Sequence, residues 1–258
     1  MTGRPLAWTR EYLLPVVAIM GLVLAWEFLC WLARIPVWLL PAPSAIVEET
    51  WKWRDLLPGH FLVTSYEVFG GFALSVLVGV PIAIAIVYSI SLKRMAYPIL
   101  LVFQSVPKVA LAPLFLIWIG YGATSNIAIA TIVAFFPMVV NTATGLESVE
   151  PNLLDLTRSL RAGVLQVFWK VRLPWALPHV FSGMKVAMSL AVVGAVVGEF
   201  VGSDKGLGFL ILTASSNMNT AMVFGVMAVL AALGILSFWL VCLAEYLVCP
   251  WYLRPKEE

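Results

Sequence analysis

The sequence predicts an all-α polytopic membrane protein with about six transmembrane helices and both termini in the cytoplasm. Of its 258 residues, 62% are apolar and only 12% are charged, whereas soluble domains average ~45–50% apolar and ~25% charged. The apolar residues form long continuous runs, unlike the alternating pattern of barrel strands. A chain that crosses a bilayer must satisfy its backbone polar groups internally, so these runs predict helices.

The same composition excludes several functional classes. A soluble enzyme needs a polar surface that this chain cannot supply, and a net charge of +2 is too small for nucleic-acid binding. No Gly-rich run ends in Lys-Ser or Lys-Thr, so no phosphate-binding loop is predicted. The two histidines, His60 and His179, flank separate apolar runs, and the three cysteines lack metal-ligand spacing. We therefore predict no catalytic residue, no metal site and no cofactor in this chain.

A spanning helix needs ~20 mostly apolar residues, and the chain contains about six such stretches. The first is interrupted only by Glu27; it is too long for a signal peptide, and no small-residue cleavage site follows it. Residues 109–146 are free of charge but too long for one span, so the turn at 120–122 divides them. The predicted spans are 12–33, 61–89, 98–119, 125–142, 178–201 and 220–248.

Orientation follows from the excess of Lys and Arg in cytoplasmic loops. With the N-terminus inside, ten Lys or Arg residues fall on the inner side and four on the outer side. On the outer side we expect a short helix at 44–57, with Ser44 as its N-cap. On the inner side, the loop 147–175 is the longest and most densely charged.

That inner loop has a helical pattern. Leu153, Leu156, Leu160 and Val164 recur at three- and four-residue spacing and would share one helix face. Such a helix either docks against a partner or lies on the bilayer surface, and the pattern alone leaves both open.

A longer motif in the loop carries a family resemblance. The motif begins with Asp155-Leu156-Thr157 and, after three residues, continues with Arg161; nine residues later it ends in Val171-Arg172-Leu173-Pro174. This pattern resembles the "EAA loop" of binding-protein-dependent ABC importer permeases. The runs 42–44, 71–74, 112–114, 135–137, 141–142 and 206–208 also resemble the nitrate/sulfonate/taurine branch, over about residues 13–250.

The resemblance implies one transmembrane permease domain over residues 1–258, with the type I importer fold, in a bacterial inner membrane. It implies two ATPase subunits that hold ATP and Mg, a second permease copy in a homodimer, a solute-binding protein and contact with membrane lipid. The inner loop would be the coupling helix, and its ATPase-coupling residues would be Asp155, Thr157, Arg158, Arg161, Ala162, Gly163, Leu173 and Pro174.

The motif departs from the family pattern where glycine is usual, because this chain has Arg161 there. We expect either a turn shifted to Gly163 or a helix that continues through Arg161. The runs 64–68 and 107–114 resemble permeases for pyrimidine thiamine precursors, riboflavin and related ring compounds. The substrate would be a small polar or anionic solute, either such a ring compound or a sulfonate- or nitrate-type anion.

Charged residues inside apolar spans are costly, at least ~2.5–3.5 kcal/mol each, and call for a reason. One hypothesis is that Lys108 lines a translocation path with Gln104 and Ser105, together with Glu67 and Glu199. The alternative is a structural ion pair of Lys108 with Glu67 or Glu199. A different class, an ion-coupled secondary transporter, would show paired broken spans, and the break at Pro107–Pro113 has no clear counterpart.

Overall fold

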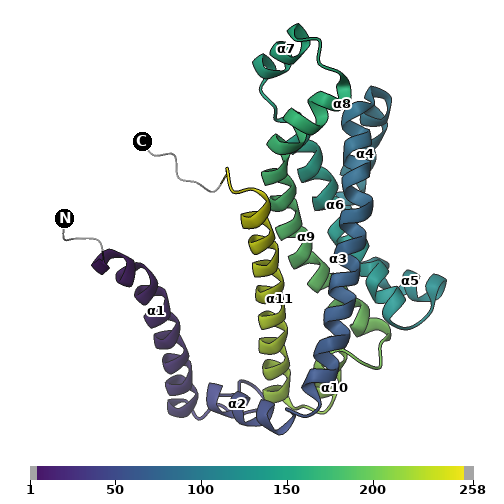
Figure 1. Cartoon of the computed structure of the whole chain (residues 1–258). Helices are drawn as coiled ribbons and strands as arrows, with labels where there is room; N and C mark the ends of the chain where they lie inside the picture. Colours follow the sequence, from purple (N-terminus) through teal and green to yellow (C-terminus); the bar gives the residue numbers. More distant parts are fainter. Residues whose placement is uncertain (1–4, 253–258) are drawn as a thin grey trace. The chain divides into compact units, whose positions relative to one another are not determined.

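The computed structural model describes residues 5–252, apart from the side-chain surroundings of residues 5–13, 15, 97, 101 and 104. All regular structure in this range is helical (Figure 1), so the all-α prediction is confirmed. The helices are α1 Pro5–Leu32, α2 Pro43–Lys52, α3 Leu57–Tyr88, α4 Ile90–Ser105, η1 Lys108–Leu111, α5 Ala112–Ile119, α6 Ala123–Glu147, α7 Pro151–Ser159, α8 Val164–Val167, η2 Phe168–Arg172, α9 Leu173–Gly202, α10 Leu207–Ser216 and α11 Thr220–Val248.

The chain divides into two compact units, each described here by itself. The first holds the residues up to Pro58 together with Leu210–Val229, and the second holds Gly59–Phe209 and the residues from Leu230 onward. Within the described residues, four helical segments are long and apolar enough to cross a membrane. They are Leu57–Tyr88, Ala123–Glu147, Val164–Gly202 and Thr220–Val248.

In the first unit, a carboxylate holds the start of α2. The two oxygens of Glu27 accept hydrogen bonds from the backbone N–H and the hydroxyl of Ser44, at 3.0 and 2.7 Å. The expected role of Ser44 as N-cap is therefore wrong: the helix begins one residue earlier, at Pro43, and Ala42 is its N-cap. An anion from α1 instead occupies the positive end of α2.

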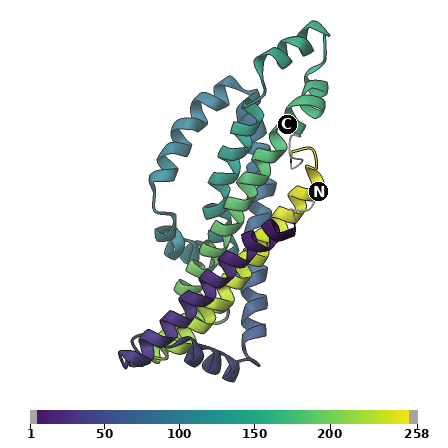
Figure 2. The same cartoon turned by 90° about the vertical axis from the view of Figure 1, so that its left-hand side faces the viewer.

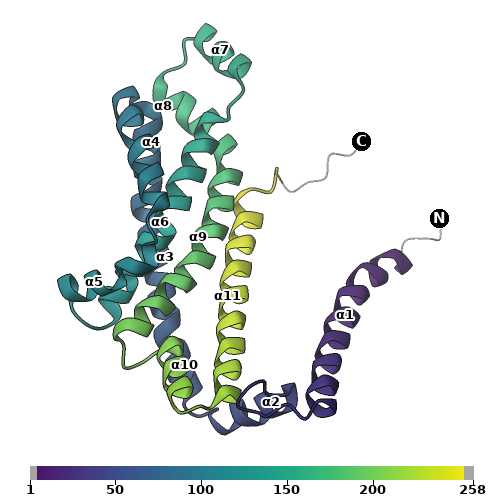
Figure 3. The same cartoon turned by 180° about the vertical axis from the view of Figure 1, so that it is seen from behind.

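In the second unit, α6 and α9 lie side by side along most of their length (Figures 2 and 3). Glycines set how closely they approach. A Cβ at Gly194 of α9 would lie 2.7 Å from the Cα of Ala130 in α6, and one at Gly145 of α6 would lie 2.6 Å from the Cβ of His179 in α9. Small residues at such positions let two membrane helices pack backbone to backbone. The buried core of this unit is built around this pair.

The predicted third span, 98–119, is not one helix. α4 starts at Ile90 and ends at Ser105, and Val106 is extended, with ψ 128°, because a residue before proline avoids the helical region. After Pro107 come the 3-10 turn η1 and the short helix α5, with Pro113 in its first turn. The other predicted spans coincide with single helices whose ends differ by a few residues.

An ion pair joins α9 to the second half of α11 inside the second unit. Lys185 Nζ lies 2.5 Å from Glu245 Oε2, with the side chains 26% and 7% exposed. The two charges lie in segments long and apolar enough to span a membrane, so each is the main compensation for the other. Losing one partner from such a pair usually costs more than replacing both.

The pair predicts an asymmetric mutational response. Lys185→Met should destabilise the purified chain by about 3–5 kcal/mol, because the buried Glu245 carboxylate loses its counter-charge. Glu245→Gln should cost less, because the more exposed Lys185 ammonium can extend towards water. Thermal unfolding in detergent measures both.

The double variant Lys185→Met with Glu245→Met is the matched control. It should be more stable than Lys185→Met alone, because no unpaired charge remains. Single-variant losses that simply add in the double variant would contradict the pairing.

Candidate functional site

The inner loop projects from one end of the α6–α9 pair, where α7 lies beyond the end of α6 (Figures 1 and 3). α7 carries exposed apolar side chains, with Leu156 55% and Leu160, just after the helix, 72% exposed. Asp155 and Arg158 form an ion pair of 2.8 Å, but both side chains are mostly exposed, so the pair adds little stability. The result is an apolar surface next to charges, which the other described residues of the second unit leave exposed.

The end of α7 differs from both expectations for Arg161. The backbone N–H of Arg161 donates to the Arg158 carbonyl at 2.9 Å, and that of Ala162 donates to the Thr157 carbonyl at 3.0 Å. This pair of bonds is the Schellman motif, whose turning residue is left-handed and usually glycine. Arg161 takes that place, with φ of +48°. The chain therefore turns at the family's glycine position itself, with a residue that disfavours the conformation.

Beyond the turn, Gly163 is extended, with φ of −68°, and is the N-cap of α8. A π-helical turn, η2, then leads into α9, whose first residues are Leu173 and Pro174. Pro174 lines a cavity of about 690 Å³ together with Leu153, Lys170 and Trp175. The predicted coupling residues thus lie along one stretch of chain, from α7 through the turn at Arg161 to the start of α9.

The predicted path residues lie in two separate places. Lys108, in η1, lines an apolar cavity of about 380 Å³ bordered by residues of α3, α4 and α6; in Figure 2, α4 bows away from α6 on this side. Its ammonium lies 5.0 Å from the centre of the Phe136 ring, a cation–π contact. Ser105 is exposed at the end of α4, and the side chain of Gln104 lies outside the described residues.

Glu67 and Glu199 lie elsewhere, each only 1% exposed inside the second unit. Neither forms an ion pair with Lys108 or any other cation in the part of the chain that the structure describes. The alternative of a structural pair between Lys108 and one of these carboxyls is therefore wrong for this structure. The two glutamates instead lie in a set of hydrogen-bonded polar groups from three helices.

Sequence reasoning missed several members of that set. Thr64 donates to Glu199 at 2.6 Å, and Asn126 donates to Glu67 at 2.8 Å. The backbone N–H of Gly208 also donates to Glu199. Residues 206–208 were noted in the sequence only because they resemble the corresponding residues of the family. Nothing in that resemblance indicated that their backbone would lie against a carboxylate.

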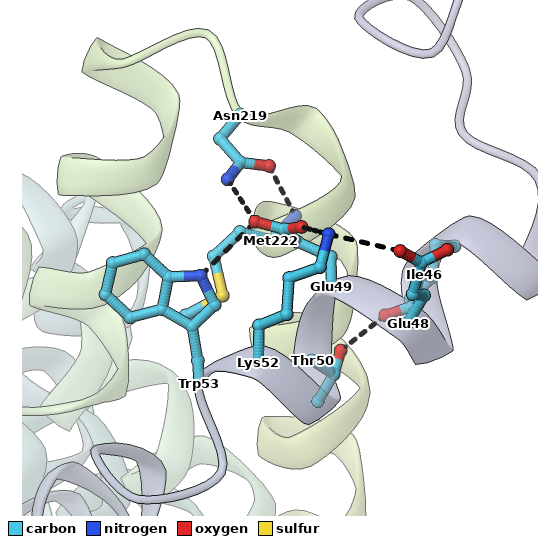
Figure 4. Close-up of polar contacts among 8 residues, drawn as sticks. All are labelled: Ile46, Glu48, Glu49, Thr50, Lys52, Trp53, Asn219 and Met222. Carbon is cyan, nitrogen blue, oxygen red and sulfur yellow. Dashed lines mark hydrogen bonds and ion pairs between the residues drawn. The ribbon is translucent and has the colours of Figure 1, made fainter.

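On the first unit, α2 is attached to the start of α11 through Glu49 (Figure 4). Its carboxylate accepts hydrogen bonds from Asn219 Nδ2 at 2.8 Å and Trp53 Nε1 at 3.3 Å, and pairs with Lys52 at 3.1 Å. The Asn219 hydrogen bond, followed by that of Lys52, lowers the pKa of Glu49. Asn219 also accepts from the backbone N–H of Met222 at 3.1 Å, so one amide joins the first turn of α11 to α2.

Among the described residues, no group of three or more His, Cys, Asp or Glu side chains could hold a metal ion. The chemistry that the site offers is therefore of another kind. It consists of an exposed apolar segment, a lysine beside an apolar cavity, and two buried carboxyl groups.

Comparison with known proteins identifies the relatives. Residues 75–248 match the family model described as "Binding-protein-dependent transport system inner membrane component". The formylaminopyrimidine transport permease protein ThiX of Halalkalibacterium halodurans is 32% identical over 244 residues, 94% of this chain and 96% of that protein. The taurine transport system permease protein TauC of Escherichia coli is 28% identical over 245 residues, 91% of this chain and 89% of that protein.

A solved structure shares the fold. The methionine ABC transporter MetNI, in an inward-facing conformation, contains a chain that superposes with a TM-score of 0.67 at 21% identity. The match covers 79% of the present chain and 99% of that one. At this identity the likeness establishes the fold alone.

The left-handed turn at Arg161 makes a prediction about stability. Arg161→Gly should raise the free energy of unfolding by about 0.5–1 kcal/mol, because the relief of ~1–2 kcal/mol of left-handed strain exceeds the extra entropy of glycine in the unfolded chain. Arg161→Ala keeps the Cβ and removes the charge, so it should give no gain. Equal shifts in the unfolding temperature of the two variants would show that the backbone conformation is not responsible.

Proposed function

This chain belongs to the binding-protein-dependent transport system inner membrane components, and we propose that two copies of it enclose the translocation path of one ATP-driven importer. It is the permease subunit of a binding-protein-dependent ABC importer, and ATP hydrolysis belongs to a partner ATPase. A solute-binding protein is the other partner that this family requires.

In our proposal the chain crosses the inner membrane six times and keeps both termini in the cytoplasm. The third crossing is made by α4 and the bent segment 106–119, because irregular backbone is tolerated at membrane depth where it lines a cavity. The exposed loop residues Asp204 and Lys205 would face the binding protein on the outer side. The excess of positive residues in the opposite loops supports this orientation.

We assign the segment from α7 to the start of α9 as the ATPase-coupling element. The observation that carries this assignment is the exposed apolar surface at Leu156 and Leu160, directly before the left-handed turn at Arg161. A short helix with an apolar face fits a groove on a partner protein. ATP-driven closure of the ATPase pair would move this helix, and the two states of the permease would follow.

The coupling assignment predicts a specific loss of assembly. Leu156→Glu should lower the amount of ATPase subunit that copurifies with the permease by about tenfold, because a charge in the apolar contact weakens binding. A tenfold decrease corresponds to a loss of about 1.4 kcal/mol of binding free energy. A charge placed in an apolar contact exceeds this value at many interfaces. Quantitative pull-down from membranes that contain both subunits measures the ratio.

Leu92→Glu is the matched control. The side chain of Leu92 is 47% exposed, a fraction similar to the 55% of Leu156. Leu92 lies beside Lys93 on the same predicted side of the membrane, outside the coupling segment. Its variant should keep the normal ATPase content. An equal loss in both variants, or in neither, would contradict the assignment.

The path itself would pass Lys108, with Ser105 and Gln104 one turn earlier. Lys108 provides a positive charge in a cavity that is otherwise almost wholly apolar, which suits a small anion or an electron-rich ring. Because Glu67 and Glu199 are enclosed within the second unit, we assign them no contact with the solute. The substrate in this proposal is a small polar or anionic solute, with a pyrimidine or related ring compound as the favoured class.

Uptake by the reconstituted importer tests the path and the substrate together. Lys108→Met should reduce uptake by about tenfold or more, equal to at least about 1.4 kcal/mol of lost interaction, while ATPase copurification stays unchanged. Lys108→Arg keeps the charge and should retain most uptake. Formylaminopyrimidine and taurine serve as probes of the two solute classes.

Uptake of formylaminopyrimidine that depends on Lys108 would support both parts of the proposal. Uptake of taurine alone would contradict the ring-compound assignment but keep the path. Full uptake by Lys108→Met would remove Lys108 from the path.

A further inference from the structure

A buried polar cluster lies where α3, α6, α9 and the first residues of α10, 207–209, meet in the second unit. Its side chains are Thr64 and Glu67 from α3, Asn126 from α6 and Glu199 from α9. All four are at most 1% exposed. Two carboxyl groups in so little water must be compensated by specific partners, because an unpaired buried charge costs several kcal/mol.

Glu199 has the partners of an anion. Its oxygens accept hydrogen bonds from the Thr64 hydroxyl at 2.6 Å and from the backbone N–H of Gly208 at 2.5 Å, and the N–H of Phe209 is a further donor. A Cβ at Gly206, where φ is +108°, would collide with the Glu199 carboxyl. The turn 206–209 is thus folded tightly over this carboxylate, and three donors point at it.

Glu67 has the partners of a neutral acid. Its Oε1 accepts one hydrogen bond, from Asn126 Nδ2 at 2.8 Å. Its Oε2 is buried and receives no hydrogen from any donor in the part of the chain that the structure describes. The two carboxyls belong to one cluster, because Thr64, one turn before Glu67 on α3, donates its hydroxyl hydrogen to Glu199. Two ionised carboxylates can only accept hydrogen bonds and would repel each other there, so a proton on Glu67 removes one of the two charges.

No Lys or Arg side chain in the described part of the chain neutralises the two carboxyl groups instead. Lys108 lies over the Phe136 ring, and Lys185 is paired with Glu245; at ~1.5 Å per residue, Lys185 is also about 21 Å from Glu199 along α9. The remaining titratable groups on the surrounding segments are His60, Tyr66 and Tyr88 of α3, Glu147 of α6, His179 of α9, and the loop residues Asp204 and Lys205. His60 Nδ1 lies 2.9 Å from the backbone nitrogen of Gly206 and 3.1 Å from its carbonyl oxygen, so this ring nitrogen is engaged by the turn and not by either carboxyl.

A metal ion fits the cluster poorly. The three hydrogens directed at the Glu199 oxygens occupy the directions from which a cation would bind, and they would repel it. Hard cations such as Ca²⁺ need six or more oxygen ligands. A proton needs only one carboxyl oxygen to carry it and a second to accept from it.

We propose that Glu67 and Glu199 form a proton-binding site that holds one proton between the two carboxyl groups at neutral pH. Glu67 is the acid, which donates from Oε2, and Glu199 is the carboxylate that accepts. The pair then carries a single negative charge, which Thr64 and the two backbone N–H groups stabilise.

Proton binding at this site depends on the position of residues 206–209. Lifting residues 206–209 away would remove two of the three donors that stabilise the Glu199 anion. The pair would then bind a second proton more readily, so the position of the turn and the proton occupancy depend on each other. Any movement of the loop 203–206 would be accompanied by a change in proton binding.

Infrared spectroscopy of the purified full-length chain in detergent at pH 7 tests the proposal. We expect a carboxylic-acid C=O band in the wild type that is lost in Glu67→Gln. Glu245→Gln is the control, because the Glu245 carboxylate is paired with Lys185; it should leave the band unchanged. Absence of the band from the wild type, or its persistence in Glu67→Gln, would overturn the proposal.

Thermal unfolding provides a second, independent measurement. In Glu67→Gln the amide N–H₂ replaces the acid O–H as donor, so the unfolding temperature should stay within about 2 °C of the wild type. In Glu199→Gln an amide group faces three donors, and the temperature should fall by about 4 °C or more. Equal losses in the two variants would overturn the assignment of acid and base. Stabilisation of the wild type by Na⁺ over choline, without the infrared band, would identify a cation site instead.

Discussion

The close contact between α6 and α9 is the constraint on which the second unit depends. Glycines at the crossing points bring the two backbones together, and no side chain larger than hydrogen fits there without a shift of the neighbouring helix. Membrane helices gain little from the hydrophobic effect among themselves, so such packing supplies much of their association. It also fixes where the polar groups of both helices lie, since Asn126 and Glu199 face the cluster from neighbouring turns of this pair.

The scarce charges of the chain are used in distinct ways. Lys185 and Glu245 neutralise each other, Glu49 joins two segments of the first unit, and Lys108 rests on an aromatic face. Asp155 and Arg158 remain at the surface of the inner loop. In a chain that is 12% charged, each of the groups Lys185, Glu245, Glu49 and Lys108 thus has an identifiable partner. This economy is expected, because an uncompensated charge is far more costly there than in a soluble domain.

Much of the fold could be predicted from the sequence, because continuous apolar runs specify membrane helices directly. The last predicted span, 220–248, coincides with α11. The prediction of the third span as one helix, 98–119, was wrong because Pro107 keeps the residue before it out of the helical conformation. An average of hydropathy over many residues does not register a single backbone break. The turn at Arg161 was also missed, since the left-handed conformation is uncommon for arginine. The grouping of Glu67 with Glu199 could not be predicted, because it depends on which helices pack together.

The candidate site was predictable to a different extent. The family motif indicated the coupling segment residue by residue, and its docking role stays a prediction. Lys108 was singled out because a lone charge in a long apolar stretch is unusual, and the structure adds the cavity beside it. Thr64, Asn126 and Gly208 gave no such signal, because uncharged polar residues and glycines are common in membrane helices.

The ion pair between α9 and α11 has a consequence for biogenesis. Glu245 lies sixty residues after Lys185 in the chain, so at ~5–20 residues per second the ribosome makes it about 3–12 s later. During that interval α9 contains an ammonium group whose partner does not yet exist. Release of α9 into lipid alone would cost ~2.5–3.5 kcal/mol. The insertion machinery therefore has a thermodynamic reason to retain α9 until α11 emerges, and to release the two helices together.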